Sequence, residues 1–374
     1  MNNLSIIFRR LAALLSLAIV TAKAQNNPEK ASFARLDSVI TKLMTDAKVP
    51  GLSLALIRNA QFDYSKSYGV TKADSTQRVD LNTVFEAASL TKPVFAYAVL
   101  QLVEEGKIDL DKPLYEYLPY PDVASDKRYE KITARLVLSH RSGFPNWRKD
   151  RKSNHLSMRS TPGERFGYSG EGFVYLQKVV EKITGNSIND VMEERVLKPL
   201  KMSNSGFVWK PSFNVDYAYP HDESGKVEEK YMPSQANMAY SLHTTANDYA
   251  RFVLALLNAT GLKRSTLDQM FSAQTQLPSR FFGSDLAPNS YWGLGIGLEK
   301  NPTGTYLWHW GDNGAFKCFV MVNLAQTEGV IYFSNGSNGL DFADELVRQT
   351  IGGQHSAFDF LGINWQKELN KKAK

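Results

Sequence analysis

Segments with the pattern of β-strands lie at both ends of this 374-residue chain, and a mainly helical stretch separates them. Alternating apolar residues predict a hairpin near the beginning, over 52–57 and 62–70. The same pattern predicts four later strands, over 292–299, 305–309, 316–323 and 329–334. Between about residues 86 and 278 the apolar residues mostly recur with a helical period. This order predicts an α/β lobe built from both ends of the chain (25–85 and 285–374) and an inserted helical lobe over 86–284.

The first residues have the features of a targeting signal. Arg9 and Arg10 precede an apolar run, residues 11–22, which is too short to span a bilayer. Ala22-Lys23-Ala24 then has the form of a cleavage site. We therefore expect a signal peptide over 1–24, cleaved near Ala24/Gln25, with export to a periplasm and no membrane anchor afterwards.

Charge and composition point away from nucleic acid and from metals. The formal charge is +6, and losing residues 1–24 removes three of the 44 basic residues and none of the 38 acidic ones, which leaves +3. That balance gives no reason to expect a nucleic-acid partner. The densest basic run, residues 148–152, is typical of a solvated loop. The single cysteine, Cys318, lies in an apolar run, so we expect its small side chain to be buried. The six histidines show no metal-ligand spacing, so we predict no metal or other cofactor.

Ser89 and Lys92 are the first candidates for chemistry. A helix is predicted to begin at Ser89, with that serine as its cap. Residues three apart share a helix face, so the Lys92 amine can reach the Ser89 hydroxyl. A serine becomes a nucleophile when a nearby base takes its proton, and burial lowers the pKa of a lysine enough for that task. An S-x-x-K pattern alone arises by chance about once or twice in a chain of this length, so a capped core helix with a surface lysine is the alternative.

Two further motifs follow at ordered distances. Tyr168-Ser169-Gly170 comes after a Pro-Gly-x-x-Phe stretch at 162–166, and His309-Trp310-Gly311 begins at the end of the predicted strand over 305–309. Together with 89–92, these motifs resemble those of the penicillin-recognising serine hydrolases, the group that includes class C β-lactamases, D-Ala-D-Ala carboxypeptidases and related esterases. The resemblance runs from about residue 35 to 350. It implies one catalytic domain with a β-lactamase/transpeptidase-like α+β fold, in which helices flank a five-stranded antiparallel sheet.

The resemblance also implies roles for these residues. Ser89 would form an acyl-enzyme, with Lys92 and Tyr168 transferring protons, and the Lys92 charge would lower the pKa of Tyr168. The backbone N–H groups of Ser89 and Asp312 would form the oxyanion hole. Gly170, His309, Trp310 and Gly311 would contact the substrate, whereas His140 would belong to a turn beneath the site. The substrate would be a small ester, amide, peptide or β-lactam.

Two positions depart from the family pattern. Gly170 stands where an asparagine usually lies, and Trp310 stands where a small hydroxyl residue is common. Both changes remove polar contacts to the substrate, so we expect short esters to react faster than β-lactams. The alternatives are a D-Ala-D-Ala carboxypeptidase or penicillin-binding protein of cell-wall metabolism, and a penicillin-binding sensor or scaffold with little turnover. An α/β-hydrolase elbow, G-x-S-x-G, is nearly matched by 167–171, but that stretch ends in Glu171 and no βαβ pattern surrounds it.

Overall fold

The computed structural model describes residues 28–150, 153–281 and 283–372. The chain divides after Val39 into two units. Helix α1 (Pro28–Ala47) crosses this division, and every other described element lies in the unit that begins at Ile40. The predicted signal peptide lies outside the described residues, so export stays a prediction. None of the helices in the described segments is long and apolar enough to cross a membrane.

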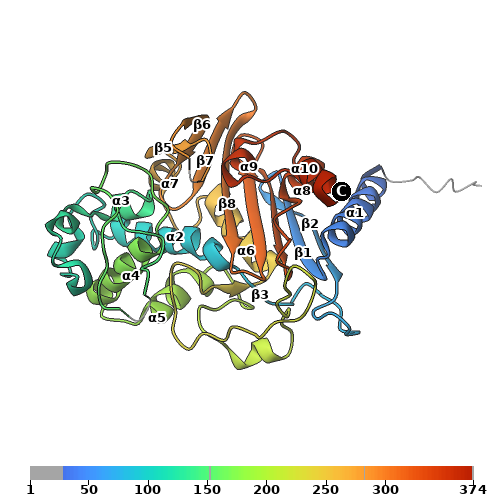
Figure 1. Cartoon of the computed structure of the whole chain (residues 1–374), viewed down its shortest axis with the longest axis horizontal. Helices are drawn as coiled ribbons and strands as arrows, with labels where there is room; N and C mark the ends of the chain where they lie inside the picture. The colour runs from blue at the N-terminus through green and yellow to red at the C-terminus, as the bar shows by residue number, and fades with distance from the viewer. Residues whose placement is uncertain (1–27, 151–152, 282, 373–374) are drawn as a thin grey trace, which may run out of the picture. The chain divides into compact units, whose positions relative to one another are not determined.

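An eight-stranded antiparallel sheet runs through the larger unit (Figure 1), in the order β2-β1-β10-β9-β8-β7-β6-β5. The strands are β1 (Gly51–Arg58), β2 (Gln61–Gly69), β5 (Thr275–Pro278), β6 (Leu286–Trp292), β7 (Gly297–Asn301), β8 (Gly304–Asp312), β9 (Lys317–Asn323) and β10 (Glu328–Ser334). Strand β1 pairs with β10, with Leu52 opposite Ser334. The early hairpin and the late strands therefore form one sheet, while the exact lobe boundaries stay a prediction.

The predicted count of five strands is wrong, because β5, β6 and β7 extend one edge of the sheet. The segment predicted as one strand over 292–299 contains the turn between two strands, since Trp292 ends β6 and residues 297–299 belong to β7. Gly293 N–H donates to Ile296 O at 2.8 Å, and Gly295 has φ +81°, a conformation that favours glycine. The adjacent strand β5 lies at the end of the stretch that was predicted to be helical.

Helices cover both faces of the sheet. They are α2 (Thr91–Glu104), α3 (Ala134–Leu138), α4 (Gly170–Thr184), α5 (Ile188–Met192), α6 (Ala246–Leu257), α7 (Arg264–Met270), α8 (Ala343–Thr350), α9 (Ser356–Leu361) and α10 (Trp365–Lys372). Leu307 and Ile331 face the core that contains α2 and α6. On the other face, Trp308 packs on Phe360 of α9 and Phe319 packs on Phe358, with ring centroids 5.7 and 5.1 Å apart. Neighbouring residues of β8 therefore serve two different layers.

Capping groups mark the ends of several helices. The hydroxyls of Thr133 and Thr245 accept hydrogen bonds from N–H groups three residues on, and Gly185 ends α4 with φ +69°. The short pair β3 (Phe85–Glu86) and β4 (His243–Thr244) holds the segment before α2 against a distant part of the chain. That pairing begins to position Ser89.

The prediction of a solvated basic loop is wrong at Arg148. Its side chain is only 12% exposed and pairs with Glu171 at 2.8 Å and Asp122 at 2.7 Å. Glu171 is buried at the start of α4, and a buried carboxylate requires a partner of opposite charge. Arg148 therefore ties this loop to α4. Residues 151–152 lie outside the described residues.

Candidate active site

Ser89 lies in a 3₁₀ turn, Ala88–Leu90, that leads into α2. The preceding Ala88 has φ +48°, an uncommon conformation for a residue with a side chain. Distant groups hold this turn: Ala87 N–H donates to Leu242 O at 2.8 Å, and the Thr91 hydroxyl donates to Ala88 O at 2.6 Å. The prediction that Ser89 caps the helix is wrong, because the N-cap is Leu90 and no side chain caps it. The 3₁₀ turn sets Ser89 two positions before the start of α2.

Lys92 contacts Ser89 directly. Its Nζ lies 3.0 Å from Ser89 Oγ and 2.7 Å from Ala239 O, so the contact expected from the spacing is present. The side chain is 1% exposed, and burial lowers the pKa of Lys92 to about 7. A large fraction of Lys92 is therefore neutral near pH 7, with a lone pair that can accept a proton.

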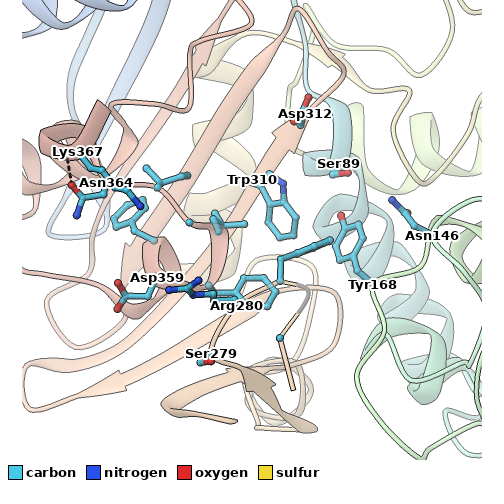
Figure 2. Close-up of a pocket in the computed structure, with 17 residues that line it drawn as sticks. Ser89, Asn146, Tyr168, Ser279, Arg280, Trp310, Asp312, Asp359, Asn364 and Lys367 are labelled. Atoms are coloured by element: carbon cyan, nitrogen blue, oxygen red, sulfur yellow. Dashed lines mark hydrogen bonds between the residues drawn. The ribbon is translucent and has the colours of Figure 1, made fainter. Parts of the chain in front are cut away.

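Tyr168 directs its hydroxyl toward Ser89 (Figure 2). The hydroxyl oxygen is buried and forms no hydrogen bond of standard geometry with the described residues. Burial raises the pKa of Tyr168, and the proximity of Ser89 opposes this rise only weakly. The expected lowering of this pKa by Lys92 is therefore wrong: the Lys92 Nζ faces the Tyr168 ring, 4.9 Å from its centroid, and burial outweighs any effect of its charge. The neutral phenol is the stable form.

His140 supports Tyr168 from beneath. Its Nδ1 accepts the Ser169 N–H at 3.0 Å, and its ring lies 4.2 Å from the Tyr168 ring. Burial and the nearby Lys92 charge lower the pKa of His140, so it stays neutral and keeps Nδ1 available as an acceptor. Its ring lines neither cavity described below, and its bond to the Ser169 N–H holds the backbone next to Tyr168.

The third motif divides between the two faces of β8. His309 is fully buried and lines neither cavity, and its Nδ1–H donates to Trp310 O at 2.7 Å. Burial and the Lys92 charge lower the pKa of His309 to about 3. Trp310 lies on the opposite face and forms a wall of the larger cavity, 5.0 Å from the Tyr168 ring.

Gly311 permits a close approach between β8 and the serine turn. A Cβ at this position would lie 2.5 Å from Ala87 O and 2.2 Å from Cys318 Sγ. Cys318 is buried as predicted, and its thiol donates to Ala87 O at 3.1 Å. The missing side chain thus lets β8 bring Asp312 to the edge of the cavities that Ser89 lines.

Two cavities meet at Ser89. The larger has a volume of about 1130 Å³ and the smaller about 460 Å³, and Ser89, Asn146 and Asp312 line both. Tyr168 and Trp310 line only the larger one. The nucleophile is therefore placed where one substrate can extend in two directions.

Asn146 and Trp147 explain the absence of a side chain at Gly170. Gly170 N–H donates to Asn146 Oδ1 at 3.0 Å, which turns the amide nitrogen toward the space between Ser89 and Tyr168 (Figure 2). A Cβ on Gly170 would lie 2.6 Å from the Trp147 ring. Gly170 therefore makes no side-chain contact itself, and a neighbouring loop supplies an amide in this region.

Comparison with known proteins identifies the family. The sequence pattern of the family described as Beta-lactamase matches residues 36–351. The chain belongs to the beta-lactamase family. It is similar to a class C beta-lactamase of known structure, with a TM-score of 0.76 and 19% identity over 88% of this chain and 98% of the other. The resemblance read from the three motifs and the β-lactamase-like α+β fold are confirmed.

Two curated relatives are also similar to this chain in sequence. Protein flp of Staphylococcus aureus is 22% identical over 328 residues, which cover 80% of this chain. This chain spans only 62% of the length of that relative. Esterase EstB of Burkholderia gladioli is 26% identical over 202 residues, covering 47% of this chain and 51% of EstB. The fold is thus that of a serine hydrolase family with an esterase among its relatives.

Several residues at the site were not anticipated from the sequence. Asn146 follows the Ser-Gly-Phe-Pro stretch at 142–145, which is typical of a loop. An amide side chain directly after such a loop was the sequence signal that could have identified Asn146 as a site residue. Phe281 and Phe360 line the larger cavity, but they lie outside all three motifs. Local sequence patterns do not reveal such residues, because only packing brings them to Ser89.

Proposed function

We propose that this protein is a serine hydrolase that forms an acyl-enzyme on Ser89. The observation that carries the proposal is the 3.0 Å contact between Ser89 Oγ and Lys92 Nζ, together with the burial that lowers the pKa of Lys92 to about 7. Neutral Lys92 accepts the Ser89 proton while Oγ bonds to the carbonyl carbon of the substrate. The backbone N–H groups of Ser89 and Asp312 stabilise the resulting oxyanion.

Tyr168 acts in this proposal as the acid for the leaving group. Its raised pKa keeps the phenol protonated at neutral pH, so it can donate when the bond from the acyl carbon to the leaving group breaks. The proton held by Lys92 then restores Tyr168. Water attacks the acyl-enzyme in the second half-reaction, releasing the acid and Ser89. His309, buried behind this site, is a positioning residue rather than a substrate contact.

Short acyl esters are the proposed preferred substrates. Trp310 adds an aromatic wall where the family commonly has a hydroxyl, and Gly170 supplies no side chain. A charge-assisted hydrogen bond contributes about 1.5 to 3 kcal/mol, so losing such contacts weakens recognition of a substrate carboxylate. The relationship to EstB supports the choice of esters, whereas β-lactams and D-Ala-D-Ala peptides are the alternatives.

Covalent labelling and turnover test the proposal together. A fluorophosphonate should label the wild type at Ser89 and leave folded Ser89→Ala unlabelled, and p-nitrophenyl acetate should turn over only with the wild type. Substrate preference follows from kcat/KM for that ester, nitrocefin and a D-Ala-D-Ala peptide. Labelling without repeated product release would favour a penicillin-binding sensor, and normal turnover by Ser89→Ala would refute the proposal.

A further inference from the structure

The position of Tyr168 separates the two directions that a substrate can take. The acid that protonates a leaving group must lie on the side from which that group departs. Tyr168 lines the cavity of about 1130 Å³ and does not line the smaller one, although Ser89 lines both. If Tyr168 is the acid, the leaving group lies in the large cavity and the acyl group in the small one.

The far wall of the large cavity comes from beyond the family match. That match ends at residue 351, whereas residues 358–364 and Lys367 line the cavity. Figure 2 shows this wall across from Ser89, where Asp359, Asn364 and Lys367 lie on the far side of Trp310 from the serine. We call residues 352–372 the C-terminal extension. Family membership therefore assigns no role to this part of the cavity.

A buried carboxylate fixes the extension to the sheet. Glu299 of β7 is 3% exposed and lies 3.0 Å from both His355 Nδ1 and Ser356 Oγ. It also accepts the Ala357 N–H at 3.3 Å, at the start of α9. On the other side of α9, Phe281 N–H donates to Phe360 O at 2.8 Å. Such contacts hold the wall in one position, as a binding subsite requires.

Aromatic and aliphatic side chains cover the path from Tyr168 to this wall. The Trp310 ring lies 5.6 Å from Phe281 and 6.2 Å from Phe360. Leu361 and Ile363 add aliphatic surface from the extension. The volume exceeds the range of about 300–1000 Å³ that is usual for small-molecule pockets. A leaving group as small as ethanol would leave most of this surface in contact with water.

We propose that the C-terminal extension forms a leaving-group subsite that accepts a bulky, mainly apolar alcohol or amine, such as one with a fused aromatic ring. This inference rests on the proposed acyl-enzyme function and names the substrate class that the site prefers. Burial of the aromatic group against Trp310, Phe281 and the extension supplies the preference. Reaction at Ser89 itself does not require the subsite.

The test compares two acetate esters that share an acyl group. Ethanol and 2-naphthylmethanol are both primary alcohols, so 2-naphthylmethyl acetate and ethyl acetate differ mainly in the size and aromatic surface of the leaving group. Acid release gives kcat/KM for both esters with the full-length protein. We expect the wild type to favour the naphthylmethyl ester by about tenfold or more, the scale of discrimination that an apolar pocket provides.

Two variants of the wall and one control then locate the preference. Ile363→Trp should reduce the naphthylmethyl-to-ethyl ratio by about tenfold by filling the cavity, mainly through KM. Leu361→Ala removes wall contacts and should reduce the ratio by about threefold. Gln366→Trp, at an exposed position of α10 that does not line the cavity, should keep the wild-type ratio.

The outcomes separate this inference from the proposed function. Ser89-dependent hydrolysis with ratios that stay within twofold of the wild type in both wall variants overturns the subsite alone. A wild type that prefers ethyl acetate also overturns it. Absence of Ser89-dependent hydrolysis of both esters, and of p-nitrophenyl acetate, overturns the proposed function and the inference with it.

Discussion

The ionisation of Lys92 should control the pH dependence of acylation. With a pKa of about 7, about half of Lys92 is neutral at pH 7, whereas with the ordinary value of 10.5 only about one molecule in 3000 would be. Burial thus increases the fraction of the basic form by about three orders of magnitude. Because the neutral form is the active one, kcat/KM for p-nitrophenyl acetate should rise by about 30-fold between pH 5.5 and 8.5.

Glu86 requires a control in this experiment. Burial raises the pKa of Glu86 to about 7, although hydrogen bonds from Asn313 and Tyr217 oppose that rise. Glu86 also lines the smaller cavity with Ser89, so its ionisation would fall in the same pH range. The profile should therefore be measured for the wild type and Glu86→Gln. A flat wild-type profile, or an inflection that disappears in Glu86→Gln, would refute the assignment to Lys92.

Three further predictions follow from neighbouring contacts. Tyr168→Phe and Lys92→Ala should each reduce kcat by about 2 to 4 orders of magnitude, and the double variant should lose far less than the product; full additivity would show independent roles. Gly170→Asn should lower thermal stability because its Cβ meets Trp147, and Trp147→Ala should restore part of it; an unchanged melting temperature in the single variant would contradict this packing. Glu86 binds its proton more tightly in the folded protein, so stability should fall between pH 4.5 and 7, by roughly 3 kcal/mol relative to Glu86→Gln in urea titrations; parallel pH curves would refute the burial effect.

Residue spacing in the sequence determined the contacts between groups that lie about one helical turn apart. Ser89 and Lys92 are three residues apart, so a helical turn places them on one face, and their side chains meet at 3.0 Å although the turn at Ser89 is 3₁₀. The caps at Thr133 and Thr245 were predictable for the same reason, since each hydroxyl bonds to a group three residues away. The order of three spaced motifs was also enough to indicate the family.

Tertiary packing decided the properties that depend on distant segments. The pKa of Lys92 falls because Ala239, Tyr168 and Phe173 enclose its amine, and these residues are 76 or more positions away in the chain. The alternation of β8 likewise gave no indication of which face met the cavity, so His309 and Trp310 were indistinguishable as substrate contacts. The close approach of the Trp147 ring to Gly170 was likewise not predictable from the sequence.

The sheet and the wall of the larger cavity also combine features that were predictable from the sequence with features that only packing decided. Alternating apolar residues predicted the hairpin and the late strands. Short strand pairs such as β5 with β6 were not predictable, because they depend on an edge that the rest of the sheet provides. The C-terminal extension carries no catalytic motif, and its relation to Ser89 exists only because Glu299 and Phe281 dock α9 beside β8. Sequence alone thus determined the candidate nucleophile and its base, while the fold decided the base's pKa and the shape of the space around it, because burial is a property of the packed chain.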